Sequence, residues 1–182
     1  LNLGTFDAGK SVERIVQLLK YQFELQQVQL RFISSSTSIG SNFFVFGQAQ
    51  RLEQVLINLI NNARDALVEH QPTDAPAIIN LSLAIEKHDG IDEIVINVTD
   101  NGPGIPIELQ EQVFKAYYTT KSTQQGTGLG LALSRDLIHD LGGKLTLASV
   151  LGNTTFSLWL PAAPNEEPLA TNEEPLATNE EP

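Results

Sequence analysis

Two short glycine-rich segments contain the residues best suited to specific chemistry. They read DNGPGIP at residues 100–106 and GTGLGL at residues 126–131. Both are too rich in glycine for the interior of a helix or a strand, so each is expected to form a loop in which the backbone approaches a bound molecule. Because the second segment directly precedes a helical pattern, the pair predicts a nucleotide-binding site.

The first segment suits the base of a nucleotide. Asp100 ends the apolar run IVINVTD, where a fixed carboxylate can accept a hydrogen bond from an exocyclic amine such as that of adenine. Gly102 and Gly104 would let a flat ring approach the main chain. Taken alone, the segment is better explained as an ordinary Asp-Asn-Gly turn, so this interpretation depends on the second segment.

The second segment suits the phosphates. Free N–H groups at the start of a helix, together with the helix dipole, attract anions. Thr127 would add a hydroxyl donor, and Lys121, in the TTK just upstream, would reach the same phosphates. The residues expected to form this cradle are Gly126, Thr127, Gly128, Leu129 and Gly130.

A third group of polar residues lies on a predicted helix. Gln54, Asn58 and Asn62 are four positions apart and therefore share one edge of that helix, beside its apolar stripe. Asparagine is unfavourable inside helices, and its amide oxygen can complete the coordination of a magnesium ion already held by phosphates. Asn62 suits that role, although a solvated polar face explains the same spacing equally well.

The remaining elements define the fold class. Apolar spacing predicts helices over residues 7–26, 50–68 and 129–141, with Asp7 as the N-cap of the first. Strands are expected over residues 28–34, 43–46, 78–86, 94–99, 144–149 and 154–160. A turn at residues 88–92 would join two of these strands, and a short helix is expected near residues 108–114. Strands and helices do not alternate strictly, so we predict an α/β (α+β) two-layer sandwich in which a mixed, mostly antiparallel sheet packs on about three helices.

Length and composition predict one domain with a tail. The 182 residues carry a net charge of -11, and six of the 22 acidic residues lie in the last eighteen positions, where NEEPLAT repeats. Proline in every repeat and only one leucine per repeat predict a disordered tail over residues 164–182, following a domain at residues 1–163. The body has 16 acidic and 11 basic residues, a balance that disfavours binding to nucleic acid.

Other classes of protein are excluded by composition. The chain has no cysteine, so it has neither a disulfide framework nor a thiolate metal site. No segment approaches the roughly eighteen apolar residues that a membrane-spanning helix needs. We therefore expect a cytoplasmic location and no contact of this part of the protein with a membrane.

Five segments occur in an order that resembles a known family. They are RLEQVLINLINNARDAL, DNGPGIP, VFKAYYTTK, GTGLGLALS and GNTTFSLWLP. They look like the asparagine box, the adenine-binding box, the aromatic lid box, the glycine box and the closing strand of the catalytic domain of bacterial sensor histidine kinases. This domain has the Bergerat ATP-binding fold shared with DNA gyrase, the heat-shock chaperones and the mismatch-repair ATPases. The similarity covers residues 6–161. The TTK and NARDAL segments most resemble those of the nitrogen-regulation and dicarboxylate-sensing kinases.

The resemblance implies a role for each matching residue. Asn62 would hold magnesium with support from Asn58, Asp100 would bind the adenine amine, Gly104 would pass under the ring, and residues 127–130 would wrap the phosphates of ATP. Residues 107–125 would form a mobile lid. Its apolar anchors would be Phe114, Tyr117 and Tyr118.

The resemblance also implies phosphoryl transfer in place of hydrolysis. The related ATPases carry a water-activating glutamate where this chain has Asn58, so hydrolysis should be slow. The phosphate would pass to a histidine on a preceding helical-hairpin domain that also dimerises the kinase, and then to a response regulator. We expect His70, His88 and His139 to be structural or solvated, which leaves the acceptor outside this chain, in a full-length protein that the resemblance allows to be anchored in the inner membrane.

Two alternatives remain. Residues 4–11, GTFDAGKS from Gly4 to Ser11, satisfy the P-loop pattern of another class of NTPase. A P-loop must follow a buried strand, however, and Gly9 to Ser11 fall inside a helical pattern. The second alternative is a nucleotide-binding pseudokinase that senses ATP without transfer, against which Asn62, Lys121 and Thr127 argue.

Overall fold

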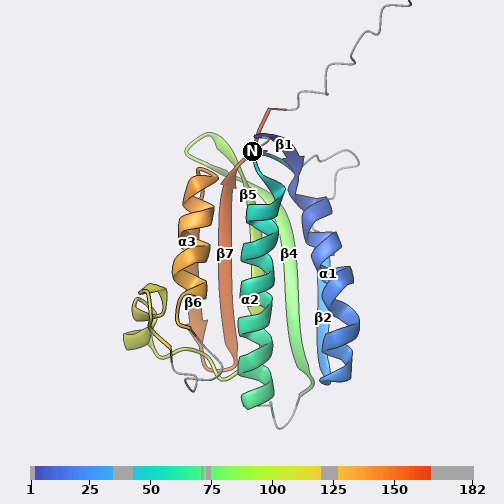
Figure 1. Ribbon diagram of the computed structural model, residues 1–182, viewed down its shortest axis with the longest axis vertical. Helices are drawn as coiled ribbons and strands as arrows, with labels where there is room; N and C mark the ends of the chain where they lie inside the picture. The colour runs from blue at the N-terminus through green and yellow to red at the C-terminus, as the bar shows by residue number, and fades with distance from the viewer. Residues whose placement is uncertain (1–2, 35–42, 71, 73–74, 120–126, 165–182) are drawn as a thin grey trace, which may run out of the picture.

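The protein is a two-layer sandwich with three α-helices on one face of a sheet (Figure 1). The computed structural model describes residues 3–34, 43–70, 72, 75–119 and 127–164. The helices are α1 (Ala8–Leu25), α2 (Ala49–Glu69) and α3 (Gly130–Asp140). All three lie where the apolar spacing predicts them, which confirms the expected fold class.

The sheet has five strands in the order β2-β4-β5-β7-β6. Their bounds are Val28–Ser34 for β2, Ala77–His88 for β4, Ile91–Asp100 for β5, Lys144–Val150 for β6 and Asn153–Pro161 for β7. The β2–β4 pair is parallel and the other pairs are antiparallel. The sheet is therefore mixed and mostly antiparallel, as predicted.

The β4–β5 hairpin is longer than the sequence indicates. The predicted turn at residues 88–92 is too long, because His88 and Ile91 are already paired in the β4–β5 ladder. Only Asp89 and Gly90 form the turn, with φ angles of 50° and 84°. Two consecutive residues with positive φ are typical of a type I′ turn, which matches the twist of the flanking strands.

A second, two-stranded sheet was only half predicted. It pairs β1 (Gly4–Asp7) with β3 (Phe44–Gly47). Asp7 both ends β1 and begins α1, since its Oδ1 accepts a hydrogen bond from the Gly9 N–H at 2.8 Å. Strand β1 was missed because four residues, one of them glycine, give too little alternation to recognise.

This arrangement overturns the P-loop alternative. Gly9 and Ser11 are buried residues of α1, whereas Lys10 is exposed on it. A β-carbon at Gly9 would lie 3.3 Å from side chains of Leu83 and Phe43. The glycine is thus explained by close packing on the core, and the segment does not form a phosphate loop.

The core fills the space between the helices and the sheet. Its largest fully buried side chains are Phe23, Leu52, Leu56, Leu59, Ile60, Leu67, Ile79, Leu81, Leu83, Ile94, Ile96 and Ile138. Five of them lie on α2, and burial of each stabilises the fold by roughly 1.5–3 kcal/mol. Because this stripe fixes the rotation of α2, it also fixes where the polar edge beside the stripe points. No helix in the described part of the chain is long and apolar enough to cross a membrane.

Candidate functional site

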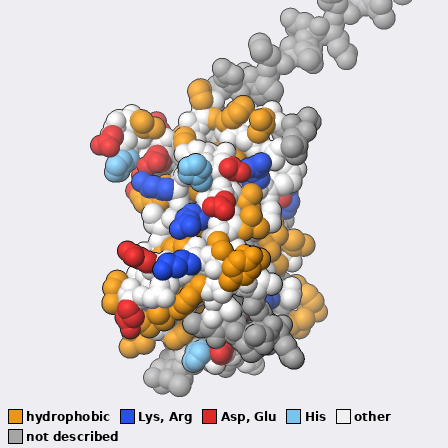
Figure 2. All heavy atoms as spheres, turned by 60° about the vertical axis from the view of Figure 1, so that its left-hand side comes forward, with side chains coloured by type: hydrophobic (Ala, Val, Ile, Leu, Met, Phe, Trp, Pro, Cys, Tyr) orange, Lys and Arg blue, Asp and Glu red, His pale blue; other side chains and the backbone are white. Residues whose placement is uncertain are grey.

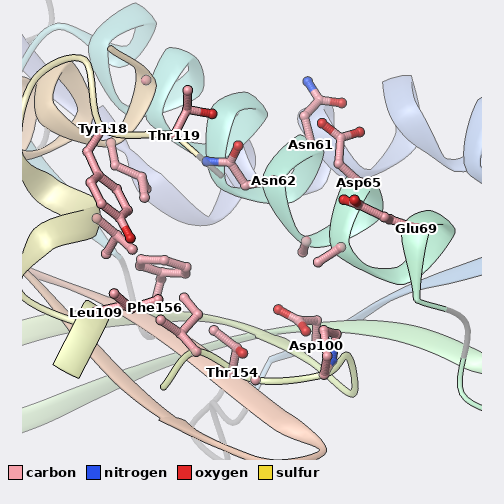
Figure 3. A pocket seen from close by; sticks show the side chains of 18 of the residues that line it. Asn61, Asn62, Asp65, Glu69, Asp100, Leu109, Tyr118, Thr119, Thr154 and Phe156 are labelled. Carbon is pink, nitrogen blue, oxygen red and sulfur yellow. The ribbon is translucent and has the colours of Figure 1, made fainter. Parts of the chain in front are cut away.

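One cavity of about 600 Å³ brings the predicted polar segments together. It lies between α2, the loop after β5, the start of α3 and residues 107–119, the described part of the predicted lid, which we call the lid region (Figure 3). Seven of the predicted site residues line it: Asn58, Asn62, Asp100, Gly104, Thr127, Gly128 and Gly130. Gly102 and Leu129 are adjacent to lining residues but do not line it, and Lys121 and Gly126 lie outside the described residues.

At one end of the cavity is a buried carboxyl group. Asp100 is the last residue of β5 and is 4% exposed. Its Oδ1 accepts a hydrogen bond from the Gly102 N–H at 2.9 Å. Burial raises the pKa of Asp100 from the usual 3.8 to about 6, and the hydrogen bond from Gly102 lowers it only in part. A carboxylate held this way is a strong acceptor for an amine that enters the cavity.

Glycine is required at position 102 and at position 104, for a different structural reason in each case. A β-carbon at Gly102 would lie 2.7 Å from Asp100 Oδ1, so glycine is needed for the bond that orients the carboxylate. Gly104 has a φ of +83°, and a β-carbon there would collide with the carbonyl oxygen of Val150 at the end of β6. Gly104 therefore lets the loop lie directly on the β6–β7 hairpin while it lines the cavity.

The polar edge of α2 forms one wall. Asn62 points into the cavity (Figure 3). Three other residues of the same helix also line it: Asn61, Asp65 and Glu69. Asn58, the other predicted asparagine, also has a structural contact. Asn58 Nδ2 donates a hydrogen bond to Ser134 Oγ of α3 at 2.9 Å, so Asn58 also joins the two helices.

The opposite end of the cavity is the start of α3. Leu129, the N-cap residue, has an apolar side chain that cannot cap the helix, and its own N–H donates to Thr127 Oγ1 at 3.4 Å. The N–H groups at the start of a helix without a capping side chain suit an anion. Gly130 allows α2 to approach, because a β-carbon there would collide with Asn58 Oδ1. Gly128 has a φ of +67°, and its carbonyl oxygen accepts a hydrogen bond from the Tyr117 N–H at 2.9 Å.

The lid region begins with two short 3-10 helices, η1 (Ile107–Leu109) and η2 (Gln112–Phe114). The Phe114 ring packs edge-on against Phe156 of β7 at 6.2 Å between centroids. Tyr118 lines the cavity. The prediction that Tyr117 is an apolar anchor is wrong, since its side chain points to solvent and the residue is 78% exposed.

Several residues that line the cavity are not predicted from the sequence. Thr154 is 4% exposed, lines the cavity and lies opposite Asp100 in the β5–β7 ladder. His70, expected to be structural or solvated, follows α2 and also lines the cavity. The closing segment GNTTFSLWLP contains Thr154, but its pairing with Asp100 depends on register, which no local pattern reveals.

Comparison with known proteins agrees with this geometry. Residues 47–164 match the model of the family described as "Histidine kinase-, DNA gyrase B-, and HSP90-like ATPase". The chain is 45% identical over 123 residues to the two-component sensor PprA of Pseudomonas aeruginosa, which covers 67% of this chain and 13% of PprA. It is 31% identical over 165 residues to the C4-dicarboxylate transport sensor protein DctB of Rhizobium meliloti, covering 88% of this chain and 24% of DctB.

A solved structure shows the same fold. The catalytic domain of the histidine kinase ThkA superposes with a TM-score of 0.71 at 25% sequence identity, covering 90% of this chain and all of that domain. The chain therefore belongs to the histidine kinase-, DNA gyrase B- and HSP90-like ATPase family, as a catalytic domain of the sensor histidine kinase type. It spans only a small part of PprA and DctB, 13% and 24% of their lengths.

Proposed function

We propose that this domain binds Mg-ATP and donates the γ-phosphate to a histidine on a separate domain of a two-component sensor kinase. The observation that carries the proposal is that one and the same cavity has a buried carboxyl group at one end and the start of α3 at the other. An amine-bearing base and a chain of phosphates need opposite kinds of partner. The two ends of this cavity offer them.

The base would occupy the Asp100 end. The ionised carboxylate would accept a hydrogen bond from the adenine amine, and Thr154 beside it would offer a hydroxyl group. Apolar side chains of Ile105 and Phe156 line the same cavity and suit the faces of a purine ring.

The phosphates would occupy the end near α3. Backbone N–H groups of residues 127–130 would bind them, with Thr127 as a hydroxyl donor and Lys121 as a cation. Lys121 and Gly126 keep these roles by resemblance alone, since they lie outside the described residues.

Asn62 fits a magnesium ion that also binds phosphate oxygens. Its amide is neutral and hard, which Mg²⁺ accepts, and it points into the cavity (Figure 3). No group of three or more His, Asp or Glu residues suited to a metal ion occurs within the described ranges. The other ligands of magnesium would then come from phosphate and water, and the ion would neutralise charge on the phosphates.

Transfer is favoured over hydrolysis by the residue at position 58. A carboxylate there would activate water, whereas Asn58 is not a base, and its Nδ2 is bonded to Ser134. The bond from the γ-phosphorus to the β–γ bridging oxygen would break, and a bond to an imidazole nitrogen would form, leaving ADP. This reaction needs mainly positioning and charge neutralisation, which a nucleotide-holding domain supplies.

None of the three histidines suits the role of acceptor. His70 lines the cavity, but it follows α2 at the Asp100 end, where the base would lie. His88 and His139 are both followed by aspartate. His88 ends β4 and lies 3.4 Å from Asp89 in the hairpin turn, while Asp140 after His139 is paired with Arg51 of α2. Neither histidine lines the cavity.

The acceptor would belong to an upstream dimerisation domain, and a response regulator would then receive the phosphate. Exposed apolar side chains near the cavity support contact with another domain, and Figure 2 shows hydrophobic side chains gathered over the lower part of this face. Ile107 of η1, Leu129 before α3 and Leu133 of α3 are exposed apolar residues. We assign the catalytic domain to residues 1–163 and the repeat tail to residues 164–182, and we place the domain in the cytoplasm, where ATP and response regulators occur.

The proposal is tested by calorimetry with a non-hydrolysable ATP analogue, with and without Mg²⁺. Asn62→Ala should remove the gain in affinity that Mg²⁺ gives. Gln54→Ala is the matched control, because Gln54 lies two turns earlier on the same edge, exposed and outside the cavity. Equal magnesium dependence in the wild type and Asn62→Ala would contradict the assignment.

Phosphoryl transfer is tested with labelled ATP. The ATP-binding domain alone should stay unlabelled, and addition of the separately produced helical-hairpin domain should give acid-labile phosphohistidine on that second domain. Tight binding of the ATP analogue without any transfer to the hairpin domain would favour a pseudokinase instead.

A further inference from the structure

The backbone of Ile105 is held at both of its polar groups. Its N–H donates to Ser149 Oγ at 2.7 Å. Its carbonyl oxygen accepts from Gln110 Nε2 at 2.8 Å, and the same nitrogen donates to the carbonyl oxygen of Ser149, also at 2.8 Å. We call these three residues the polar clamp. Both hydrogens of one glutamine amide are therefore used on two different segments.

The polar clamp joins three parts of the fold that are separate in sequence. Ile105 belongs to the loop after β5, Ser149 lies near the end of β6, and Gln110 directly follows η1 at the start of the lid region. Ser149 Oγ also lies 2.9 Å from Thr154 Oγ1, and Thr154 faces Asp100 in the β5–β7 ladder. A chain of hydrogen bonds thus leads from Gln110 in the lid region to Thr154, which lies at the end of the cavity that contains Asp100.

The clamped loop forms part of the cavity wall. Gly104, Ile105 and Leu109 all line the cavity. The left-handed conformation of Gly104 gives the loop one sharp bend, and the hydrogen bonds of Ile105 fix the residue directly after that bend. Loss of the clamp would free the loop to move away from β6 and would enlarge the space beside Asp100.

We propose that Gln110 and Ser149 are positioning residues for the purine base, which they hold in place through the backbone of Ile105. The inference rests on the proposed function, because it takes the Asp100 end as the base site. Neither residue lines the cavity, so neither touches the nucleotide. We expect their effect at the base end, where Ile105 and Asp100 lie, because the lid region reaches the phosphate end through a separate hydrogen bond, from the Tyr117 N–H to the carbonyl oxygen of Gly128.

The chain offers a matched control. Gln112 Nε2 donates to the carbonyl oxygen of Glu108 at 3.0 Å. It is also a glutamine of the lid region bonded to backbone, but its bond stays within that region and reaches neither Ile105 nor Ser149. Gln110→Leu removes both clamp donors while keeping side-chain bulk, and Gln112→Leu removes one donor without touching the clamp.

The test combines two measurements on the same variants. The first is calorimetric affinity for adenosine, ADP and the ATP analogue. Gln110→Leu should weaken all three by the same factor, about 5- to 30-fold for the loss of two hydrogen bonds, with unchanged dependence on Mg²⁺. The second is NMR hydrogen exchange of the Ile105 amide in the nucleotide-free protein, which should become faster in Gln110→Leu. Gln112→Leu should match the wild type in both measurements.

Ser149→Ala provides an independent variant, because it removes the acceptor of the Ile105 N–H. It should reproduce the pattern of Gln110→Leu. A loss of affinity that grows with the number of phosphates, an unchanged Ile105 amide, or equal losses in Gln112→Leu would each overturn the proposal. If the wild type binds no adenine compound, the proposed function fails, and faster Ile105 exchange in Gln110→Leu would still show the clamp to be real.

Discussion

Replacement of Asp100 by asparagine should make the protein more stable and a poorer nucleotide binder. Burial raises the pKa of Asp100 from 3.8 to about 6. At neutral pH the folded protein therefore keeps an unfavourably buried charge, whose cost corresponds to about 3 kcal/mol of unfolding free energy at 1.36 kcal/mol per pKa unit. Asparagine has nearly the same shape and no charge, so Asp100→Asn should gain up to this amount.

The gain in unfolding free energy of Asp100→Asn should depend on pH in a direction set by the pKa shift. Because the pKa of Asp100 is higher in the folded than in the unfolded state, the folded protein binds more protons between about pH 4 and pH 6. The wild type therefore regains the lost stability as the pH falls through this window. The advantage of Asp100→Asn in urea denaturation should be full at pH 7.5 and should have vanished near pH 4.

Whereas Asp100→Asn should raise stability, it should lower the affinity for nucleotide. Loss of a charged acceptor for the adenine amine should weaken binding of ADP by roughly 1.5–3 kcal/mol, which is about 10- to 150-fold. Asp89→Asn is the control for charge, since Asp89 lies in the exposed hairpin turn and should change stability by no more than about 0.5 kcal/mol. The reasoning is refuted if Asp100→Asn is no more stable than the wild type at pH 7.5, or if its advantage is the same at both pH values.

Three further predictions follow from single residues. Binding of adenosine, which has no phosphate to titrate, should weaken as the pH falls below about 6, because protonation of Asp100 removes the charge of the acceptor; the affinity of Asp100→Asn, measured in parallel, should stay flat. Gly104→Ala should lower the unfolding free energy by roughly 1–3 kcal/mol, given its positive φ and the nearby Val150 carbonyl, and an unchanged urea midpoint would contradict this. Lys10→Ala should leave ADP affinity intact, whereas a large loss would restore the P-loop alternative.

Sequence predicted most of the elements because their patterns are local. The apolar residues of α2 recur at helical spacing, and the same spacing places Asn58 and Asn62 on one edge. Asp7 was recognised as an N-cap because capping involves only residues next to it. The strand β1 and the narrow turn at Asp89 and Gly90 were not found, since pairing with a distant strand decides where such elements begin and end.

The chain itself therefore determined which residues can do chemistry here: a carboxylate before a glycine turn, two amides on a helix edge and a glycine loop before a helix. Only the tertiary structure decided how they are supported. The register that sets Thr154 opposite Asp100, the contact of Gly104 with Val150 and the polar clamp around Ile105 all join residues far apart in sequence. Such contacts arise from packing of the whole sheet against its helices, which spacing along the chain does not record.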